Sequence, residues 1–278
     1  MHIGLCYFPT DYGIDVRELA RAVEERGFDS LLFPEHTHIP TSRRTPYPGG
    51  GELPRCYSHS HDPFVALSFA AAATTKIHLG TGICLVPQRD PIVTAKAVAS
   101  LDRLSGGRFV LGIGFGWNAD ELESHGVTMP DRRAVVRERV LAMRALWRDD
   151  VAAFDGEFVH LAPSWSWPKP VRPGGPPVLI GGAAGPKLFA HVAEYADGWI
   201  PIGGAGVRAA TADLARACEA IGRDPATLRI VPFGTVPDPG KLDYYASIGV
   251  TEVVLRLPSA TADRVLPILD EYASLVER

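Results

Sequence analysis

The strongest constraint on the fold of this chain is an alternation of short apolar runs with helical patterns along almost its whole length. In the first half, apolar runs short enough to be strands occupy residues 3–8, 30–33, 77–85 and 108–113. After the first run, Val16, Leu19, Ala20 and Val23 recur at the spacing of one helix face, and Gly27 then ends the pattern. Such alternation is typical of a parallel sheet covered by helices.

The second half of the chain continues the alternation. Strands are expected at residues 178–180, 199–202, 228–233 and 252–257, and helices are expected to begin at Pro186, Val207, Lys241 and Thr261. The total is about eight strands, each followed by a helix, which is the number that closes a (β/α)8 barrel. An open doubly wound sheet has the same local alternation, so the pattern alone predicts an α/β fold and leaves both architectures open.

Local signals place three element boundaries. Asp62-Pro63 and Asp90-Pro91 each combine an N-cap carboxylate with a proline suited to the first helical turn, so a helix is expected after each pair. Residues 154–158 read Phe-Asp-Gly-Glu-Phe, in which Asp-Gly between apolar residues favours a tight hairpin. This hairpin is expected to be an insertion outside the repeat.

Composition restricts the function classes. A chain of 278 residues with 46% hydrophobic residues can bury one large core, and a single domain spanning residues 1–278 is expected. The net charge of -4 lacks the basic excess that nucleic-acid binding requires. The four cysteines form no disulfide, zinc or redox spacing, and the sequence shows neither a signal peptide nor an apolar run long enough to cross a membrane. We therefore expect a cytoplasmic protein with no nucleic-acid or membrane partner.

The residues that follow each expected strand are the candidates for function, because the active site of a parallel barrel lies at the C-terminal ends of its strands. Strand 30–33 is followed by Glu35, His36, Thr37 and His38, and then by a loop longer than a connection needs. A carboxylate beside an imidazole suits proton transfer near neutral pH, with Glu35 holding or tuning His36. The alternative is that His36 only packs at the strand end.

Glycines mark three further strand ends. In residues 80–83, Gly-Thr-Gly-Ile interrupts a strand, which is typical of a bulge or of close backbone approach to a ligand. Residues 112–118 place three alternate glycines before Trp117 and Asn118, which would let a flat ring lie against the backbone. This run lacks the spacing of a dinucleotide-binding fingerprint. Residues 181–185 lead into the helix at Pro186, where free N–H groups favour a phosphate, although an ordinary glycine turn would look the same.

Several motifs together resemble one known family. Residues 79–83 read Leu-Gly-Thr-Gly-Ile, residues 101–108 read Leu-Asp-Arg-Leu-Ser-Gly-Gly-Arg, and residues 111–117 read Leu-Gly-Ile-Gly-Phe-Gly-Trp. With Gly181-Gly182 and Ala-Asp-Gly-Trp-Ile-Pro at 196–201, they closely resemble the luciferase-like monooxygenase superfamily. The resemblance runs through most of the chain and implies a TIM barrel with inserted loops.

The resemblance also implies a cofactor site. It places a non-proline cis peptide at Gly82-Ile83, against the central ring of a flavin or deazaflavin, and the phosphate at Gly181, Gly182 and Ala183. In the deazaflavin branch an Asp-His pair follows the second strand, with the histidine near the reactive ring carbon, and here Glu35-His36 replaces it. The residues expected to bind the ring and its chain are Phe8, Thr81, Gly82, Ile83, Gly114, Phe115 and Asn118.

The compact length and the run Glu-His-Thr-His-Ile-Pro at 35–40 are more similar to deazaflavin oxidoreductases than to the long FMN monooxygenases. Coenzyme F420 is therefore the expected cofactor, with FMN as the alternative. The expected reaction is hydride transfer between F420 and a small-molecule substrate, with His36 as proton donor or acceptor. The resemblance further implies a homodimer.

Two other functions stay open from the sequence. The pairs His36, His38 and His59, His61 have a spacing found among ligands of metal-dependent barrel hydrolases. The later strand ends offer glycine, Ile200-Pro201 and Leu257-Pro258 rather than acids, so no metal is expected. A barrel that has lost its cofactor and only binds a ligand is the other alternative.

Overall fold

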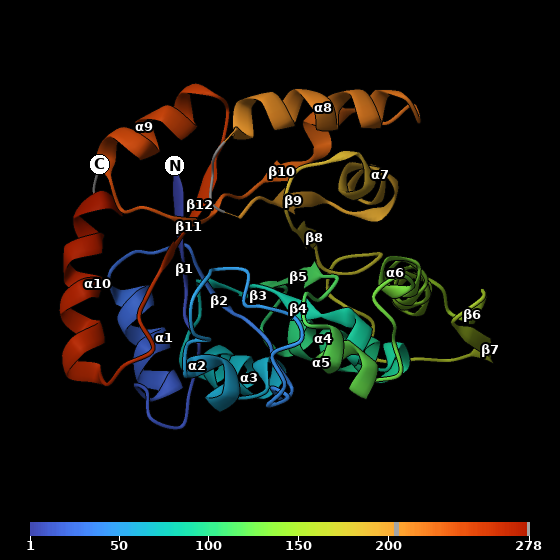
Figure 1. Cartoon of the computed structure of the whole chain (residues 1–278), viewed down its shortest axis with the longest axis horizontal. Coiled ribbons are helices and arrows are strands. Elements are labelled where there is room, and N and C mark those ends of the chain that lie inside the picture. Colours follow the sequence, from blue (N-terminus) through green and yellow to red (C-terminus); the bar gives the residue numbers. More distant parts are fainter. Residues whose placement is uncertain (203–205, 277–278) are drawn as a thin grey trace.

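The computed structural model describes residues 1–202 and 206–276 and contains a ring of parallel strands with helices around it (Figure 1). Neighbouring strands of the ring pair in the order β10-β9-β8-β5-β3-β2-β1-β12-β11, and β4 also pairs with β5. The strands are β1 His2–Cys6, β2 Ser30–Phe33, β3 His78–Thr81, β4 Cys84–Leu85, β5 Phe109–Gly114, β8 Val178–Gly181, β9 Gly198–Ile200, β10 Arg229–Ile230, β11 Phe233–Thr235 and β12 Glu252–Arg256.

The ring is closed by segment 229–235, which contains both β10 and β11. On one side the Val231 amide donates to the Trp199 carbonyl at 2.9 Å, and on the other the Val254 amide donates to the Pro232 carbonyl at 2.9 Å. The single strand expected at 228–233 is therefore split at Pro232, which has no N–H to donate. With 229–235 counted as one strand and β3 with β4 as another, the described chain has the eight strands of the predicted barrel.

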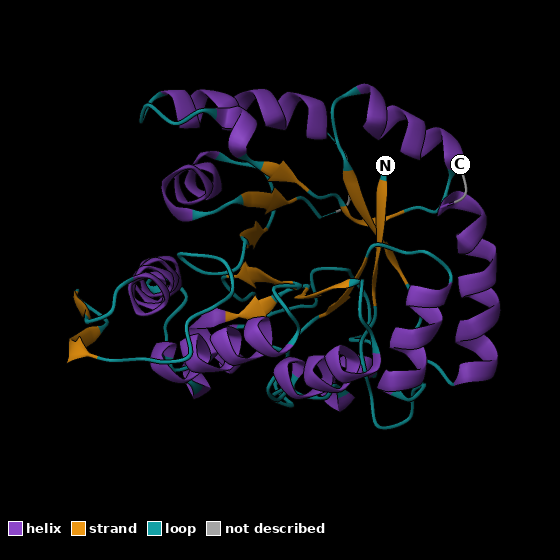
Figure 2. Ribbon diagram, turned by 180° about the vertical axis from the view of Figure 1, so that it is seen from behind, coloured by secondary structure: helices purple, strands orange, loops and turns teal. Residues whose placement is uncertain are grey.

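Helices cover the outside of the ring (Figure 2). They are α1 Val16–Glu25, α3 Pro63–Ala73, α4 Pro91–Leu104, α6 Arg132–Arg148, α7 Pro186–Tyr195, α8 Val207–Glu219, α9 Pro239–Ser247 and α10 Ala262–Val276. The predicted starts of α3 and α4 are confirmed, because the carboxylates of Asp62 and Asp90 each accept two backbone N–H groups of the first turn. The short elements α2 Cys56–His59, α5 Ala119–Ser124, η1 Val86–Gln88 and η2 Pro225–Thr227 were not expected from the sequence.

The predicted hairpin is present outside the ring, as β6 Ala152–Asp155 paired antiparallel with β7 His160–Ser164 (Figure 1). A carboxylate on α6 holds its turn: Glu138 accepts from the amides of Glu157, Phe158 and Val159 at 2.9, 2.7 and 3.0 Å. These charge-assisted bonds fix the hairpin against the barrel.

Two apolar layers result from the alternation of side chains along the strands. A small cluster fills the interior of the barrel and consists of Cys6, Leu32, Val110, Leu179, Ile200, Val231, Phe233 and Val254. The residues between them, such as Leu5, Leu31, Leu111 and Val253, belong to a larger cluster between the strands and the helices. The interior cluster forms a packed floor below the C-terminal mouth of the barrel.

Within residues 1–202 and 206–276, no helix has the length and apolar character needed to cross a bilayer. All four cysteines are free thiols. The cytoplasmic location expected from the sequence stays a prediction.

Candidate functional site

The structure brings the predicted site residues to one end of the barrel. Because the strands are parallel, their C-terminal ends meet at a single mouth. The predicted residues lie at the ends of β1, β2, β3, β5 and β8. Thr81, Gly114 and Gly181 are the last residues of β3, β5 and β8, and the residues that follow a strand are Phe8, Glu35, His36, Gly82, Ile83, Phe115, Asn118, Gly182 and Ala183. Candidates taken from five separate segments therefore surround one opening.

Ile83 forms part of the floor of this mouth. The predicted cis peptide at Gly82-Ile83 is present, and the Ile83 side chain packs on the interior cluster. A Cβ atom at Gly114 would lie only 2.0 Å from Cδ1 of Ile83, and one at Gly181 would lie 3.0 Å from Cγ2. Glycines on β5 and β8 thus leave the space that the Ile83 side chain fills.

Two of the predicted cofactor-binding residues have side chains that lie away from the mouth. Thr81 is fully buried, and its hydroxyl donates to the carbonyl of Gly112 at 2.6 Å. The Phe115 ring belongs to the outer core, with the guanidinium of Arg133 at 4.4 Å from its centre. Neither side chain is therefore available to a molecule in the mouth.

His36 forms a buried pair with Glu121, which the sequence analysis did not identify. Nδ1 of His36 lies 2.8 and 3.0 Å from the two carboxylate oxygens of Glu121. The His36 side chain is 6% exposed and that of Glu121 is 1% exposed, so water screens the interaction little. Glu121 lies in the first turn of α5, where an acidic residue is common for its favourable effect on the helix dipole, so the sequence gave no specific signal.

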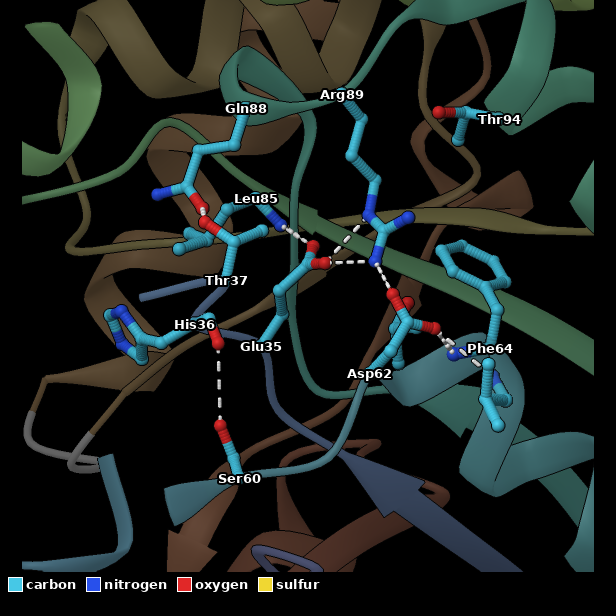
Figure 3. A network of polar contacts seen from close by, with 12 residues as sticks. Glu35, His36, Thr37, Ser60, Asp62, Phe64, Leu85, Gln88, Arg89 and Thr94 are labelled. Atoms are coloured by element: carbon cyan, nitrogen blue, oxygen red, sulfur yellow. Dashed lines mark hydrogen bonds and ion pairs between the residues drawn. The ribbon is translucent and has the colours of Figure 1, made fainter. Parts of the chain in front are cut away.

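Glu35 does not hold His36, which corrects the expected pairing. Adjacent residues of an extended segment project to opposite sides, and the Glu35 carboxylate points away from the imidazole (Figure 3). It accepts from the Leu85 amide at 2.7 Å and from Nε of Arg89 at 2.6 Å. Arg89 also binds Asp62, at 2.5 Å. Glu35 therefore ties the end of β2 to the segment that follows Ile83 and, through Arg89, to the start of α3.

Aromatic rings line the mouth beside His36. The imidazole lies 4.9 Å from the ring of Tyr57 and 6.1 Å from that of Trp117. Tyr57 in turn lies 4.8 Å from Phe8, and its hydroxyl donates to that of Tyr47 at 3.3 Å. Burial and the hydrogen bond to Tyr47 hold the pKa of Tyr57 above its usual range, so the phenol is neutral. The loop 37–61 thus supplies two neutral aromatic rings, Tyr47 and Tyr57, to the wall of the mouth.

Asn118 supplies an amide that fits a polar ligand. It is 2% exposed, yet neither its Oδ1 nor its Nδ2 has a hydrogen-bond partner among the described residues. An unpaired buried polar group costs about 1–3 kcal/mol, so such an amide is expected to find its partner in a bound molecule. The partner must offer both a donor and an acceptor.

The glycine turn after β8 presents main-chain groups at the mouth. The Trp199 indole donates to the Gly182 carbonyl at 2.9 Å, and the Gly182 amide donates to the Ile200 carbonyl at 3.2 Å, which fixes the turn. The following helix α7 begins at Pro186 after Gly185, with no side-chain cap. Its first N–H groups remain available to an anion.

The histidines of the alternative metal site do not converge. His36 pairs with Glu121, whereas Nδ1 of His38 lies 3.1 Å from the Thr37 hydroxyl and Nδ1 of His59 lies 2.9 Å from Asp11. In the part of the chain that the structure describes, no three His, Cys, Asp or Glu side chains are grouped to share a metal ion.

Comparisons with known proteins give the following matches. The model of a family described as luciferase-like monooxygenase matches residues 11–237. An uncharacterised protein of Mycobacterium tuberculosis is 43% identical over 282 residues, which cover 99% of this chain and 98% of that protein. An F420-dependent glucose-6-phosphate dehydrogenase of Kineococcus radiotolerans is 31% identical over 198 residues, which cover 68% of this chain and 52% of that enzyme. A crystal structure of a monooxygenase from Streptomyces bottropensis shares the fold, with a TM-score of 0.78 at 20% identity over 99% of this chain and 98% of that one.

Proposed function

The chain belongs to the luciferase-like monooxygenase family, and from that premise we propose that it is an F420-dependent oxidoreductase, which transfers a hydride between the deazaflavin ring and a small organic substrate. The observation that carries the proposal is the buried His36–Glu121 pair at the mouth of the barrel. Hydride transfer to or from an alcohol or carbonyl carbon requires a proton to move at the adjacent oxygen, and a carboxylate-supported imidazole is suited to that step.

The residues around the mouth fit a deazaflavin. The apolar floor at Ile83 suits a flat ring, the unpaired amide of Asn118 suits the donor and acceptor groups of a ring edge, and Gly181 to Ala183 suit a phosphate. When bound, a deazaflavin supplies a ring carbon that gives or takes a hydride and reacts little with oxygen.

The His36–Glu121 pair would accept or donate the proton at the substrate oxygen. Glu121 accepts a hydrogen bond from Nδ1–H, which fixes the tautomer and leaves the lone pair of Nε2 for a substrate hydroxyl. Nε2 takes the proton when an alcohol is oxidised and returns it when a carbonyl is reduced. Glu121 stabilises the imidazolium that forms, as a buried carboxylate does in other acid–base pairs. The rings of Tyr57 and Trp117 limit the access of water to this proton.

A monooxygenase that uses FMN and oxygen is the second candidate, because the family description and the description of the neighbouring structure name monooxygenase activity for related proteins. The F420-dependent relative and the acid–base pair favour hydride transfer.

Cofactor titration tests the proposal. The apo-protein, titrated separately with F420 and with FMN while fluorescence is followed, is expected to bind F420 at least tenfold more tightly. Asn118→Leu is expected to weaken that binding about tenfold, the effect of one or two lost hydrogen bonds. Thr74→Val, which removes a buried hydroxyl that donates to the Ala70 carbonyl after α3, at the opposite end of the barrel, serves as the control. Tighter binding of FMN would replace the proposal by the monooxygenase alternative, and binding of neither cofactor would contradict both.

We further propose that the chain forms the homodimer implied by the family. Helix α3 is apolar on all sides, and Val65 and Phe69, one turn apart, are 59% and 53% exposed. Ile92 and Val93 of the adjacent helix α4 are exposed as well. Phe69→Glu is expected to convert a dimer into a monomer in light-scattering measurements, whereas Ile221→Glu, at an exposed apolar residue near α8, leaves the mass unchanged. A parent chain that is monomeric at micromolar concentration would refute this surface.

A further inference from the structure

Arg256 lies at the mouth of the barrel, at the last position of β12. It is paired in register with Cys6 of β1, and Val254, two residues earlier, belongs to the interior cluster. Because side chains alternate along a strand, Arg256 projects to the interior side, above that cluster. Consistent with this, a Cβ atom at Gly234 of β11 would lie 3.7 Å from Nη2 of Arg256. The guanidinium is therefore placed where a ligand in the mouth could reach it.

The Arg256 guanidinium has no carboxylate partner in the part of the chain that the structure describes. Cys6, Cys56 and Tyr57 are ionisable groups that lie close enough to feel the charge of Arg256. Burial raises the pKa of Cys6 to about 12, raises that of Cys56 and holds that of Tyr57 above its usual range. All three are neutral near pH 7, so the mouth carries an unpaired positive charge at this point.

Arg256 and His36 lie at strand ends that are separated by one strand. Arg256 ends β12, His36 follows β2, and β1 lies between these two strands. Two strand spacings of about 4.8 Å place the strand ends about 10 Å apart. The rings of Phe8 and Tyr57, with centres 4.8 Å apart, lie beside His36 on this side of the mouth. The mouth of the barrel therefore presents an acid–base group, an aromatic wall and a cation, one beside the other.

We propose that Arg256 determines substrate specificity by binding an anionic group, a carboxylate or a phosphate, on a small substrate whose reacting carbon lies at His36. The inference rests on the proposed function, since it assigns the substrate class of the same site. A guanidinium binds either oxyanion through two parallel hydrogen bonds. The anionic part of the cofactor is expected elsewhere, at Gly181 to Ala183 after β8, and β9 and segment 229–235 separate β8 from β12.

A binding experiment without cofactor tests the proposal. Benzoate and benzamide have the same ring and differ in charge, and their dissociation constants for the apo-protein can be measured by calorimetry. Benzoate is expected to bind at least tenfold more tightly, Arg256→Gln to abolish the difference and Arg256→Lys to keep part of it. Arg103→Gln, an exposed arginine in the last turn of α4 at the other end of the barrel, is the control for net charge. Equal binding of the two probes to the parent, or an unchanged preference in Arg256→Gln, would overturn the proposal.

Titration with F420 tests whether Arg256 binds the cofactor instead of the substrate. Binding of F420 to Arg256→Gln is expected to stay within twofold of the parent, and a tenfold weakening would overturn the assignment by making Arg256 a cofactor ligand. If the parent protein does not bind F420, this result contradicts the proposed function but not the proposal for Arg256. The benzoate comparison contains no cofactor and still decides whether Arg256 binds an anion.

Discussion

Replacing His36 with alanine is expected to lower the turnover number by about 10²–10⁴-fold, because the proton at the substrate oxygen then has no positioned donor or acceptor. The rate is measured as the change in F420 absorbance with the best substrate from a panel of small alcohols and carbonyl compounds. His38→Ala is the matched control, since His38 is exposed and hydrogen-bonded to Thr37. F420 binding should change little in either variant.

The variant Glu121→Gln distinguishes the role of Glu121 in positioning His36 from the role of its negative charge. The amide oxygen can still accept from Nδ1 of His36, but the negative charge that stabilises the imidazolium is lost, so turnover should fall to a level between those of the parent and His36→Ala. Glu123→Gln, an exposed neighbour on α5, should behave like the parent. Parental turnover in both His36→Ala and Glu121→Gln would remove the pair from the mechanism.

The largest loss of stability is expected for Glu35→Ala. Burial disfavours the charge of Arg89, but Glu35 and Asp62 raise its pKa above the usual range, so the guanidinium stays charged. Without Glu35, which is 1% exposed, a largely buried cation loses its main partner and the Leu85 amide loses its acceptor. The free energy of unfolding should fall by about 3–5 kcal/mol, measured by urea denaturation.

The double variant Glu35→Met with Arg89→Met tests the cause of that loss. Removing both charges leaves no uncompensated ion, so the double variant should be more stable than Glu35→Ala alone. Asp62→Asn, at the exposed end of the network, should lower the unfolding free energy by about 1 kcal/mol. A loss in Glu35→Ala no larger than that in Asp62→Asn would show that the buried ion pair is not what fixes this region.

Local sequence signals predicted the α/β alternation, and the family resemblance favoured the closed barrel over the open sheet. The approximate strand positions, the starts of α3 and α4 and the hairpin followed from apolar periodicity, Asp-Pro pairs and an Asp-Gly turn, each of which acts over a few residues, whereas the position of the cis peptide was implied by the family resemblance. The split of the last-but-one strand at Pro232 was missed, although proline cannot donate within a sheet.

The partners within the site could not be predicted in the same way. His36 and Glu121 are 85 residues apart and meet only because β2 and β5 end at one mouth. The helix that carries Glu121 has six residues, too few for a periodic signal. The orientation of Glu35 could have been predicted, because neighbouring residues on an extended chain point to opposite sides. For Arg256, an arginine at a strand end is ordinary, and only its register with Cys6 places it inside the barrel.

The Glu35–Arg89–Asp62 network also has a consequence for how this scaffold can diversify. Tyr47 and Tyr57 of the aromatic wall lie in the loop 37–61, and the carboxylates that flank this loop, Glu35 and Asp62, are bound by the same guanidinium of Arg89 (Figure 3). The Arg89 guanidinium therefore holds both ends of the loop together. A loop anchored at both ends can be replaced by one of different sequence that admits different molecules. The His36 imidazole at its N-terminal edge then keeps its position.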